Sequence, residues 1–328
     1  MAYTTIDDSQ AHFQVATWTG DGNDDRNITL PGTTDMQPNV VWVKGRSDDD
    51  SHRFYDSTRG ATKYLNTATN GAEGTSADGM QAFQSDGFQI GTDGSHNGNT
   101  KTYAGFCWKE SADSGLDVVS YTGNGTARTI AHNLSAVPKM MIFKNLARGD
   151  NWDTYHHYIG NGSALFFNST AAADDQTLYF NDTTPTSSVF TIGSNTSLNA
   201  DGEACIAYVF APKQGFSKFG SYIGNGLASG TTVYTGFAPK LVITKMNGTA
   251  NWVIKTKGVG DVGNIQTDFL YASNTAAEGD GSDIAFLGNG FKWMDTETNN
   301  NQAGSTYIYM AFAESPYVNS EGVPNNAL

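Results

Sequence analysis

The sequence predicts an all-β protein built from three tandem β-sandwich domains of the jelly-roll kind. Three observations predict this. A pattern of about 100 residues occurs three times, the segments between turns are short and rich in β-branched and aromatic residues, and helical patterns are weak throughout. A period of this length exceeds that of solenoid and propeller repeats and matches a complete small domain. Single helical turns are expected only in two Ala-rich pieces, Ala171 to Asp175 and Ala276 to Gly279.

The first part of the pattern joins a glycine turn to a short apolar run. An aromatic residue and a Gly-Asx-Gly turn come first, and an apolar run then begins at a Pro and ends at a Lys six positions later. The three runs are Pro38 to Lys44, Pro138 to Lys144 and Pro239 to Lys245. Such runs are too short for helices, so each is expected to form a buried strand.

The second part of the pattern closes each copy with a strand that ends in an aromatic residue. The segments run from Phe88 to Trp108, from Phe190 to Phe210 and from Phe291 to Phe312, so their ends are spaced 20, 20 and 21 positions apart. Between the two parts lie short aromatic segments separated by Gly, Asn, Ser and Asp, which are turn residues. Each copy therefore reads as a set of short strands, as in a sandwich.

Alignment of the copies divides the chain into three domains. Their limits are residues 1–112 with an N-terminal leader, 113–215, and 216–328 with a C-terminal tail. Both joints are short, so we expect the domains to pack with fixed geometry. Three similar domains in one chain can imitate a trimer, and we expect them to surround a pseudo-threefold axis. A linear arrangement would contradict this.

Composition limits the classes of partner. The net charge is −14 and no Lys/Arg cluster occurs, so a nucleic-acid partner is not expected. The sequence shows neither a signal peptide nor an apolar run long enough to cross a membrane, so we expect a protein made in the cytoplasm without membrane insertion. Cys107 and Cys205 occupy different places in their copies, which favours free thiols over a disulfide.

Asp21, Asn23 and Asp25 have the alternate-residue spacing of oxygen ligands in a calcium loop. Arg26 stands where an EF-hand loop has Gly, and no distal Glu completes the set. The other copies carry Asn in the place of Asp21, which lowers the charge available to a cation. A plain turn is therefore the favoured interpretation, and we expect no metal and no cofactor.

Trp152 and Trp252 each follow an Asn at the same point of their copies, and Tyr155 and His156 come soon after the first. Exposed aromatic rings can stack on sugar rings, so these four residues form the candidate ligand-binding set. Recurrence favours the alternative, because a fold needs the same core aromatic in every copy whereas identical ligand sites are optional. His156 and His157 do not suggest a metal site, since adjacent residues of a strand point to opposite faces.

Catalytic motifs are missing from the sequence. It has no Gly-x-Ser-x-Gly, no phosphate-binding loop and no His-Glu-x-x-His. The two acids of a glycosidase can be far apart in sequence, so a polysaccharide depolymerase stays an alternative without positive support. It predicts two carboxylates facing each other across a groove in one copy. The expectation is that the protein is not an enzyme.

Several strings taken together resemble a known family. They are "PKMMIFKN", "NWDTYH", "NDTTPTSSVFTIGS" and "CIAYVFAPKQGFSKFGSYIGNG". They are similar to uncharacterised repeated domains encoded in virion-structural gene clusters of tailed bacteriophages, especially marine ones. The resemblance covers nearly the whole chain and is looser in the first copy. Those domains are distantly similar to concanavalin-like or SPRY-like β-sandwiches.

The resemblance implies a place on the virion surface, as a tail fibre, an appendage or a capsid decoration. The implied partners are other capsid or tail proteins, and copies of the chain itself. The alternative is an adhesin or receptor-binding protein that recognises a host surface glycan. Such binding would use loops between the fixed strands, namely Ser47 to Ser51, His156 to Asn161 and Gly258 to Gly263. The resemblance brings no catalytic residues with it.

Overall fold

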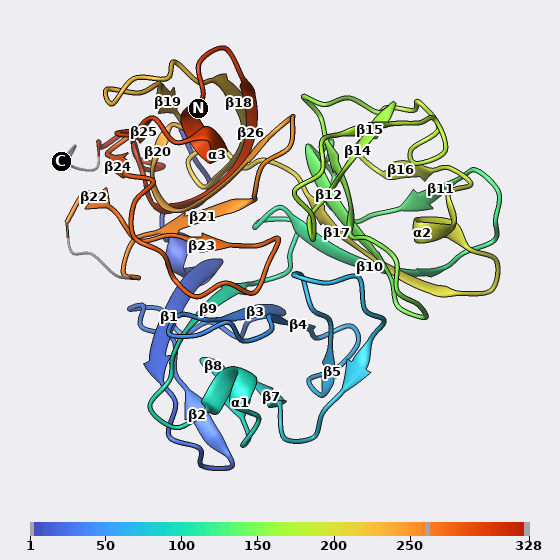
Figure 1. The fold of residues 1–328 in the computed structure, drawn as a ribbon, viewed down its shortest axis with the longest axis horizontal. Coiled ribbons are helices and arrows are strands. Elements are labelled where there is room, and N and C mark those ends of the chain that lie inside the picture. The colour runs from blue at the N-terminus through green and yellow to red at the C-terminus, as the bar shows by residue number, and fades with distance from the viewer. Residues whose placement is uncertain (1–2, 260–262, 325–328) are drawn as a thin grey trace.

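The computed structural model describes residues 3–259 and 263–324, and the protein is mostly β, with 41% strand and 5% helix. The strands form several antiparallel sheets, so the predicted all-β class is confirmed in this form. Figure 1 shows three lobes around a common centre, coloured blue to cyan, green to yellow, and orange to red. We call these lobes repeats 1, 2 and 3, with the residue limits predicted above.

The same strand order occurs in the main sheet of every repeat. The strand that precedes the Gly-Asx-Gly turn lies at one edge of the sheet and pairs with the last strand of the repeat. The last strand pairs on its other side with the Pro-to-Lys strand, which in turn pairs with the strand that follows it in the chain. In repeat 1 this order is β1 (Phe13–Thr19), β9 (Thr102–Trp108), β3 (Val40–Gly45) and β4 (Arg53–Asp56). A smaller sheet holds β2 (Arg26–Ile28), β8 (Gly87–Ile90) and β7 (Met80–Gln84), and β5 (Lys63–Tyr64) pairs with β6 (Gly74–Thr75).

Repeats 2 and 3 follow this plan. The main sheet of repeat 2 contains, in order, β10 (Leu116–Thr122), β17 (Ala204–Phe210), β12 (Met140–Asn145), β13 (Asp153–His156), β14 (Ser163–Phe166) and β15 (Asp174–Asp175). Its smaller sheet is the pair β11 (Arg128–Ala131) and β16 (Val189–Ile192). The main sheet of repeat 3 is β18 (Ser217–Ile223), β26 (Thr306–Pro316), β20 (Phe237–Met246), β21 (Val253–Thr256) and β23 (Leu270–Tyr271). Its smaller sheet is β19 (Thr232–Tyr234), β25 (Gly290–Trp293), β24 (Ile284–Leu287) and β22 (Ile265–Gln266).

One helical turn precedes the last strand of each repeat. These turns are α1 (Gly94–Asn97), α2 (Thr196–Asn199) and α3 (Thr298–Asn301). The two Ala-rich pieces expected to be helical are not: residues 171–175 are coil and β15, and residues 276–279 hold no helix. That expectation was wrong because the helix propensity of so few residues does not offset the cost of starting a helix. The turns that do form at α1 and α2 have side-chain caps, where Asp93 and Asn195 accept backbone N–H groups.

The Pro-to-Lys strands are buried on both faces, which explains their continuous apolar sequence. In β3, Val40 and Trp42 face a core shared by all three repeats, whereas Val41 and Val43 face a core of repeat 1 alone. Strand β12 divides its side chains in the same way between the shared core and a core of repeat 2. The main sheets of repeats 1 and 2 therefore each lie between the shared core and a core of their own repeat, whereas both faces of β20 in repeat 3 belong to the shared core.

The shared core joins aromatic rings from different repeats. Phe54 of repeat 1 packs edge-on against Trp152 of repeat 2 at a centroid distance of 5.7 Å, and Phe167 packs against Trp252 of repeat 3 at 5.0 Å. Phe312 of β26 stacks on Phe13 of β1 at 5.2 Å, which connects repeat 3 back to repeat 1. The three repeats thus surround one centre and do not form a line.

Equivalent backbone hydrogen bonds close the three junctions between repeats. The N–H of Glu73 donates to the carbonyl of Leu146 at 3.0 Å, and the N–H of Ala173 donates to Asn247 at 3.2 Å. At the third junction the backbone N–H of Glu278 donates to the carbonyl of Arg46 at 2.8 Å. The side chains of these two residues also form a bidentate ion pair. The contacts run in a circle, as a pseudo-threefold arrangement requires.

The leader and the tail lie together at the junction of repeats 3 and 1. Ile6 is part of the shared core, and the Tyr3 hydroxyl donates to the carbonyl of Gly236 at 3.0 Å. The backbone N–H of Ser320 donates to the Asp7 carboxylate at 2.6 Å. The leader is therefore part of the folded body, where it covers one end of the shared core.

Candidate functional site

The four predicted ligand-binding residues lie in the interior. Trp152 and Trp252 belong to the shared core, and each indole N–H donates across a junction, to the carbonyl of Asn66 at 3.0 Å and of Phe166 at 2.9 Å. Neither ring offers a face to solvent, which corrects the expectation of exposed platforms. The alternative, that recurrent aromatics serve the core, agrees with these positions. In repeat 1 the place of the Trp is taken by buried His52, which accepts from the Trp42 indole at 3.2 Å.

Tyr155 and His156 are also buried, on opposite faces of β13. Tyr155 packs edge-on against Phe180 in the core of repeat 2. His156 faces repeat 3, where its Nε2 donates to the carbonyl of Tyr309 at 3.4 Å while its Nδ1 accepts from the N–H of Tyr158. Burial lowers the pKa of His156 to about 3, so it is a neutral junction residue.

The calcium candidates form a hydrogen-bonded turn. Asp21 accepts from the N–H of Asn23 at 2.9 Å and lies 3.5 Å from the Arg26 guanidinium. Asp25 adopts a left-handed conformation with φ of 54°. Within the described part of the chain, no group of three or more His, Cys, Asp or Glu side chains is placed to hold a metal ion.

A buried Asn explains the recurrent turn. Asn199, the last residue of α2, accepts from the N–H of Asn124 at 3.0 Å and donates to the carbonyls of Thr126 and Gly193. Asn97 and Asn301 make the equivalent bonds in repeats 1 and 3. The first Gly of the turn must lack a side chain, because a Cβ at Gly123 would lie 2.1 Å from the carbonyl oxygen of Ala200.

The recurrent lysines are buried ammonium groups; two of them donate across junctions, whereas Lys245 donates within repeat 3 to the carbonyls of Met246 and Gly248. Lys44, Lys144 and Lys245 end the three apolar runs, and each has no exposed surface. Burial lowers the pKa of each to about 8. Lys44 Nζ donates across the junction to the carbonyl of Thr275 at 2.9 Å, and Lys144 Nζ donates to Asn70 of repeat 1 at 3.3 Å. Sequence reasoning found these lysines but not their role, because their partners are backbone carbonyls.

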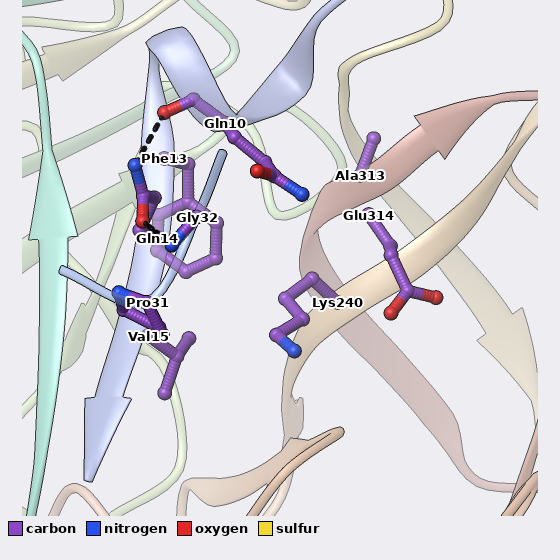
Figure 2. Close-up of a pocket in the computed structure, with 9 residues that line it drawn as sticks. All are labelled: Gln10, Phe13, Gln14, Val15, Pro31, Gly32, Lys240, Ala313 and Glu314. Atoms are coloured by element: carbon purple, nitrogen blue, oxygen red, sulfur yellow. Dashed lines mark hydrogen bonds between the residues drawn. The ribbon is translucent and has the colours of Figure 1, made fainter. Parts of the chain in front are cut away.

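Hollows open to the surface lie at the junctions. The first lies between β1 of repeat 1 and strands β20 and β26 of repeat 3, and its volume is about 160 Å³. Figure 2 shows Phe13 and Gln14 on one side of this hollow and Lys240 and Glu314 on the other. The Gln14 amide is already used, since it donates to the carbonyl of Gln10 and accepts from the backbone N–H of Gly32 at 2.7 Å.

The second hollow lies between repeats 1 and 2 and is lined by two carboxyl groups, those of Glu110 and Asp117. Glu110 accepts from the N–H of Val118 at 2.9 Å, and Asp117 accepts from the N–H of Asn133 at 2.6 Å. Burial and the neighbouring Asp117 carboxylate raise the pKa of Glu110. Both carboxylates are already held by backbone N–H groups of repeat 2.

The third hollow is a groove between repeats 2 and 3, with a volume of about 280 Å³. We call it the tyrosine groove because Tyr158, Tyr222, Tyr234 and Tyr309 line it, together with the aromatic ring of Phe219. Tyr158 is 58% exposed and Tyr234 is 65% exposed. Tyr158 belongs to the loop His156 to Asn161, which the sequence analysis named as a place for binding. Of the loop Gly258 to Gly263, residues 260–262 lie outside the described residues.

In a comparison with protein families, the model of the domain of unknown function DUF7483 matches residues 8–316. The chain belongs to this family. The match begins in the leader and ends at the last residue of β26, so the DUF7483 unit comprises the three repeats together. No curated protein matches the chain. None of the described helices is long and apolar enough to span a membrane.

Proposed function

We propose that this DUF7483 protein is a structural component of a bacteriophage virion surface, either a tail fibre or appendage or a capsid decoration. In this proposal the three repeats are β-sandwich domains of jelly-roll or concanavalin-like type that present their loops outward. The observation that carries the proposal is the circular set of junctions around one core. A single chain with near-threefold shape fits a threefold position on a capsid or the end of a trimeric fibre.

The low charge content supports a place on the surface of a particle that meets different salt concentrations. The core shared by the repeats is apolar and aromatic, and the charged content is only 16% with a net charge of −14. Hydrophobic burial is not screened by salt, whereas exposed ion pairs contribute little and are screened. The fold is therefore expected to keep its stability over a wide range of ionic strength.

The location is tested on purified phage particles that carry this gene. Antibody against the protein, detected by immunogold electron microscopy and followed by a cryo-EM map of the particle, is expected to label the capsid or the tail. Density on the shell would establish a decoration and density at the tail tip an appendage. Particles without the protein, by immunogold and by mass spectrometry, would contradict the proposal.

A second candidate function is an adhesin that binds a host surface glycan, because the tyrosine groove exposes aromatic rings. Fluorescently labelled protein is expected to bind host cells, and prior removal of the surface polysaccharide is expected to abolish that binding. Equal binding to stripped cells would contradict a glycan receptor. Incubation with the same polysaccharide is expected to release no new reducing ends, because the function proposed here is binding and not hydrolysis.

A further inference from the structure

We infer that the tyrosine groove is a binding site for a short segment of a neutral polysaccharide, held between the exposed rings of Tyr158 and Tyr234. This inference deepens the second candidate function by naming its site. It concerns the isolated protein, so it does not depend on where the protein lies on a particle.

The floor of the groove is fixed across the junction by two neutral histidines. His157 Nε2 donates to the carbonyl of Phe219 at 3.0 Å, and His156 contacts the carbonyl of Tyr309. The ring of Tyr158 packs on His157 at a centroid distance of 4.3 Å, so its position is held before any ligand arrives. A pre-positioned aromatic ring loses little conformational entropy on binding.

Gly220 leaves the space that the side chain of Tyr309 occupies. Gly220 of β18 pairs with Tyr309 of β26, and a Cβ on Gly220 would lie 2.4 Å from the Tyr309 hydroxyl. The Tyr309 ring therefore lies over Gly220 and forms part of the groove wall. The corresponding residues of repeats 1 and 2 are Ala16 and Val119, which would fill this space.

The two exposed tyrosines do not recur, and this separates them from the core aromatics. By strand register, the place of Tyr234 is taken by Thr29 and Ala131 in the other repeats. The place of Tyr158 is taken by a Thr and a Gly. The fold therefore forms without either ring. Single exposed rings are common on protein surfaces, so what points to a ligand is that both rings line the same groove.

The lining of the groove identifies the class of ligand. A sugar ring has one face of C–H groups that packs on an aromatic ring, and hydroxyl groups around its edge that need hydrogen-bond partners. The hydroxyls of Tyr158, Ser221, Thr232 and Tyr234 supply such partners. Among the lining residues Lys218 carries a charge, and its amine already donates to the carbonyl of Tyr234 at 2.6 Å. A neutral saccharide therefore fits better than an acidic one, in a protein whose net charge is −14.

The test is affinity electrophoresis of the full-length protein in native gels. Separate gels contain dextran, laminarin, galactomannan or xyloglucan as neutral probes and alginate as an acidic probe. At least one neutral polysaccharide is expected to retard the protein. Tyr158→Ala and Tyr234→Ala are each expected to raise the apparent Kd about tenfold or more, and Tyr158→Phe is expected to keep most of the affinity because the ring stays.

Leu178→Ala is the matched control, because Leu178 is 48% exposed and lies outside the groove in repeat 2. It is expected to migrate like the wild type in every gel. The inference is overturned if no neutral polysaccharide retards the protein, if alginate alone does, or if both Tyr→Ala variants bind as the wild type does. Immunogold labelling of particles is a separate measurement, so loss of saccharide binding with labelling retained rejects this site and leaves the virion location standing.

Discussion

Lys144 is a buried residue whose removal is expected to destabilise the fold. Its ammonium group donates to the carbonyls of Asn70, Asn145, Arg148 and Asp150 at 2.9–3.3 Å, in a place without solvent. Lys144→Met would leave these carbonyls without that donor. We expect the free energy of unfolding, measured in urea, to fall by about 3–5 kcal/mol.

The control for this change is Lys63→Met, because Lys63 has a 40% exposed side chain and makes surface contacts only. It should change the free energy of unfolding by less than about 1 kcal/mol. A Lys144→Met protein as stable as the control would show that the junction carbonyls do not need the ammonium group.

Buried histidines make stability depend on pH. Burial lowers the pKa of His96 to about 4, against 6.5 in the unfolded chain. Between these values the unfolded state binds more protons, so His96 lowers stability as pH falls. Asp153 acts in the opposite direction, because burial raises its pKa to about 7 and its native form keeps the proton. Asp153 contributes equally to the wild type and to a His96 variant, so the difference between their free energies of unfolding does not contain this opposing contribution.

His96→Leu reproduces the residue that repeat 2 has at this place, Leu198. It removes the hydrogen bond to Tyr55 at 2.5 Å, so the variant is expected to be less stable than the wild type at neutral pH. Between about pH 7 and pH 4.5, however, its free energy of unfolding should fall by about 2 kcal/mol less than that of the wild type. Parallel losses in both proteins would exclude His96 as a source of the acid sensitivity.

At the scale of elements, each short helix places one Asn against the Gly-Asx-Gly turn. Asn199→Ala removes three hydrogen bonds from a buried position, and we expect it to lower the free energy of unfolding by about 2–4 kcal/mol. Asn99→Ala is the control, since Asn99 is exposed. Equal midpoints of urea unfolding for the two variants would mean that the turn holds its shape without the Asn side chain.

The strands were predictable where the sequence has a local signal. The apolar runs ending at Lys44 and Lys144 became β3 and β12, because a strand buried on both faces needs apolar residues at consecutive positions. The helical turns were missed because their signal is a cap and one Asn in four residues, without apolar periodicity. The roles of Trp152 and Trp252 could only be settled by burial, which depends on partners about 86 residues away.

At the scale of the whole molecule, the repeat predicted three similar units and the structure places them around one core. The tyrosine groove could not be predicted from the sequence, because Tyr158 and Tyr234 are far apart in the chain and line one groove only where repeats 2 and 3 pack together. The loop that holds Tyr158 could be named as variable, but nothing in its sequence indicates the neighbouring ring. Residues that differ between copies, and not those that recur, therefore indicate the candidate binding surface.

The central claim is that the circle of junctions makes the three repeats one cooperative body. Hydrogen exchange with mass spectrometry tests it, on the wild type and on Trp252→Phe, which loses the indole bond to Phe166 across one junction. We expect the most protected amides of all three repeats to share one free energy of opening, and the variant to lower it by about 1–3 kcal/mol in every repeat. Full protection of repeat 1 in the variant, with loss confined to repeats 2 and 3, would contradict the claim.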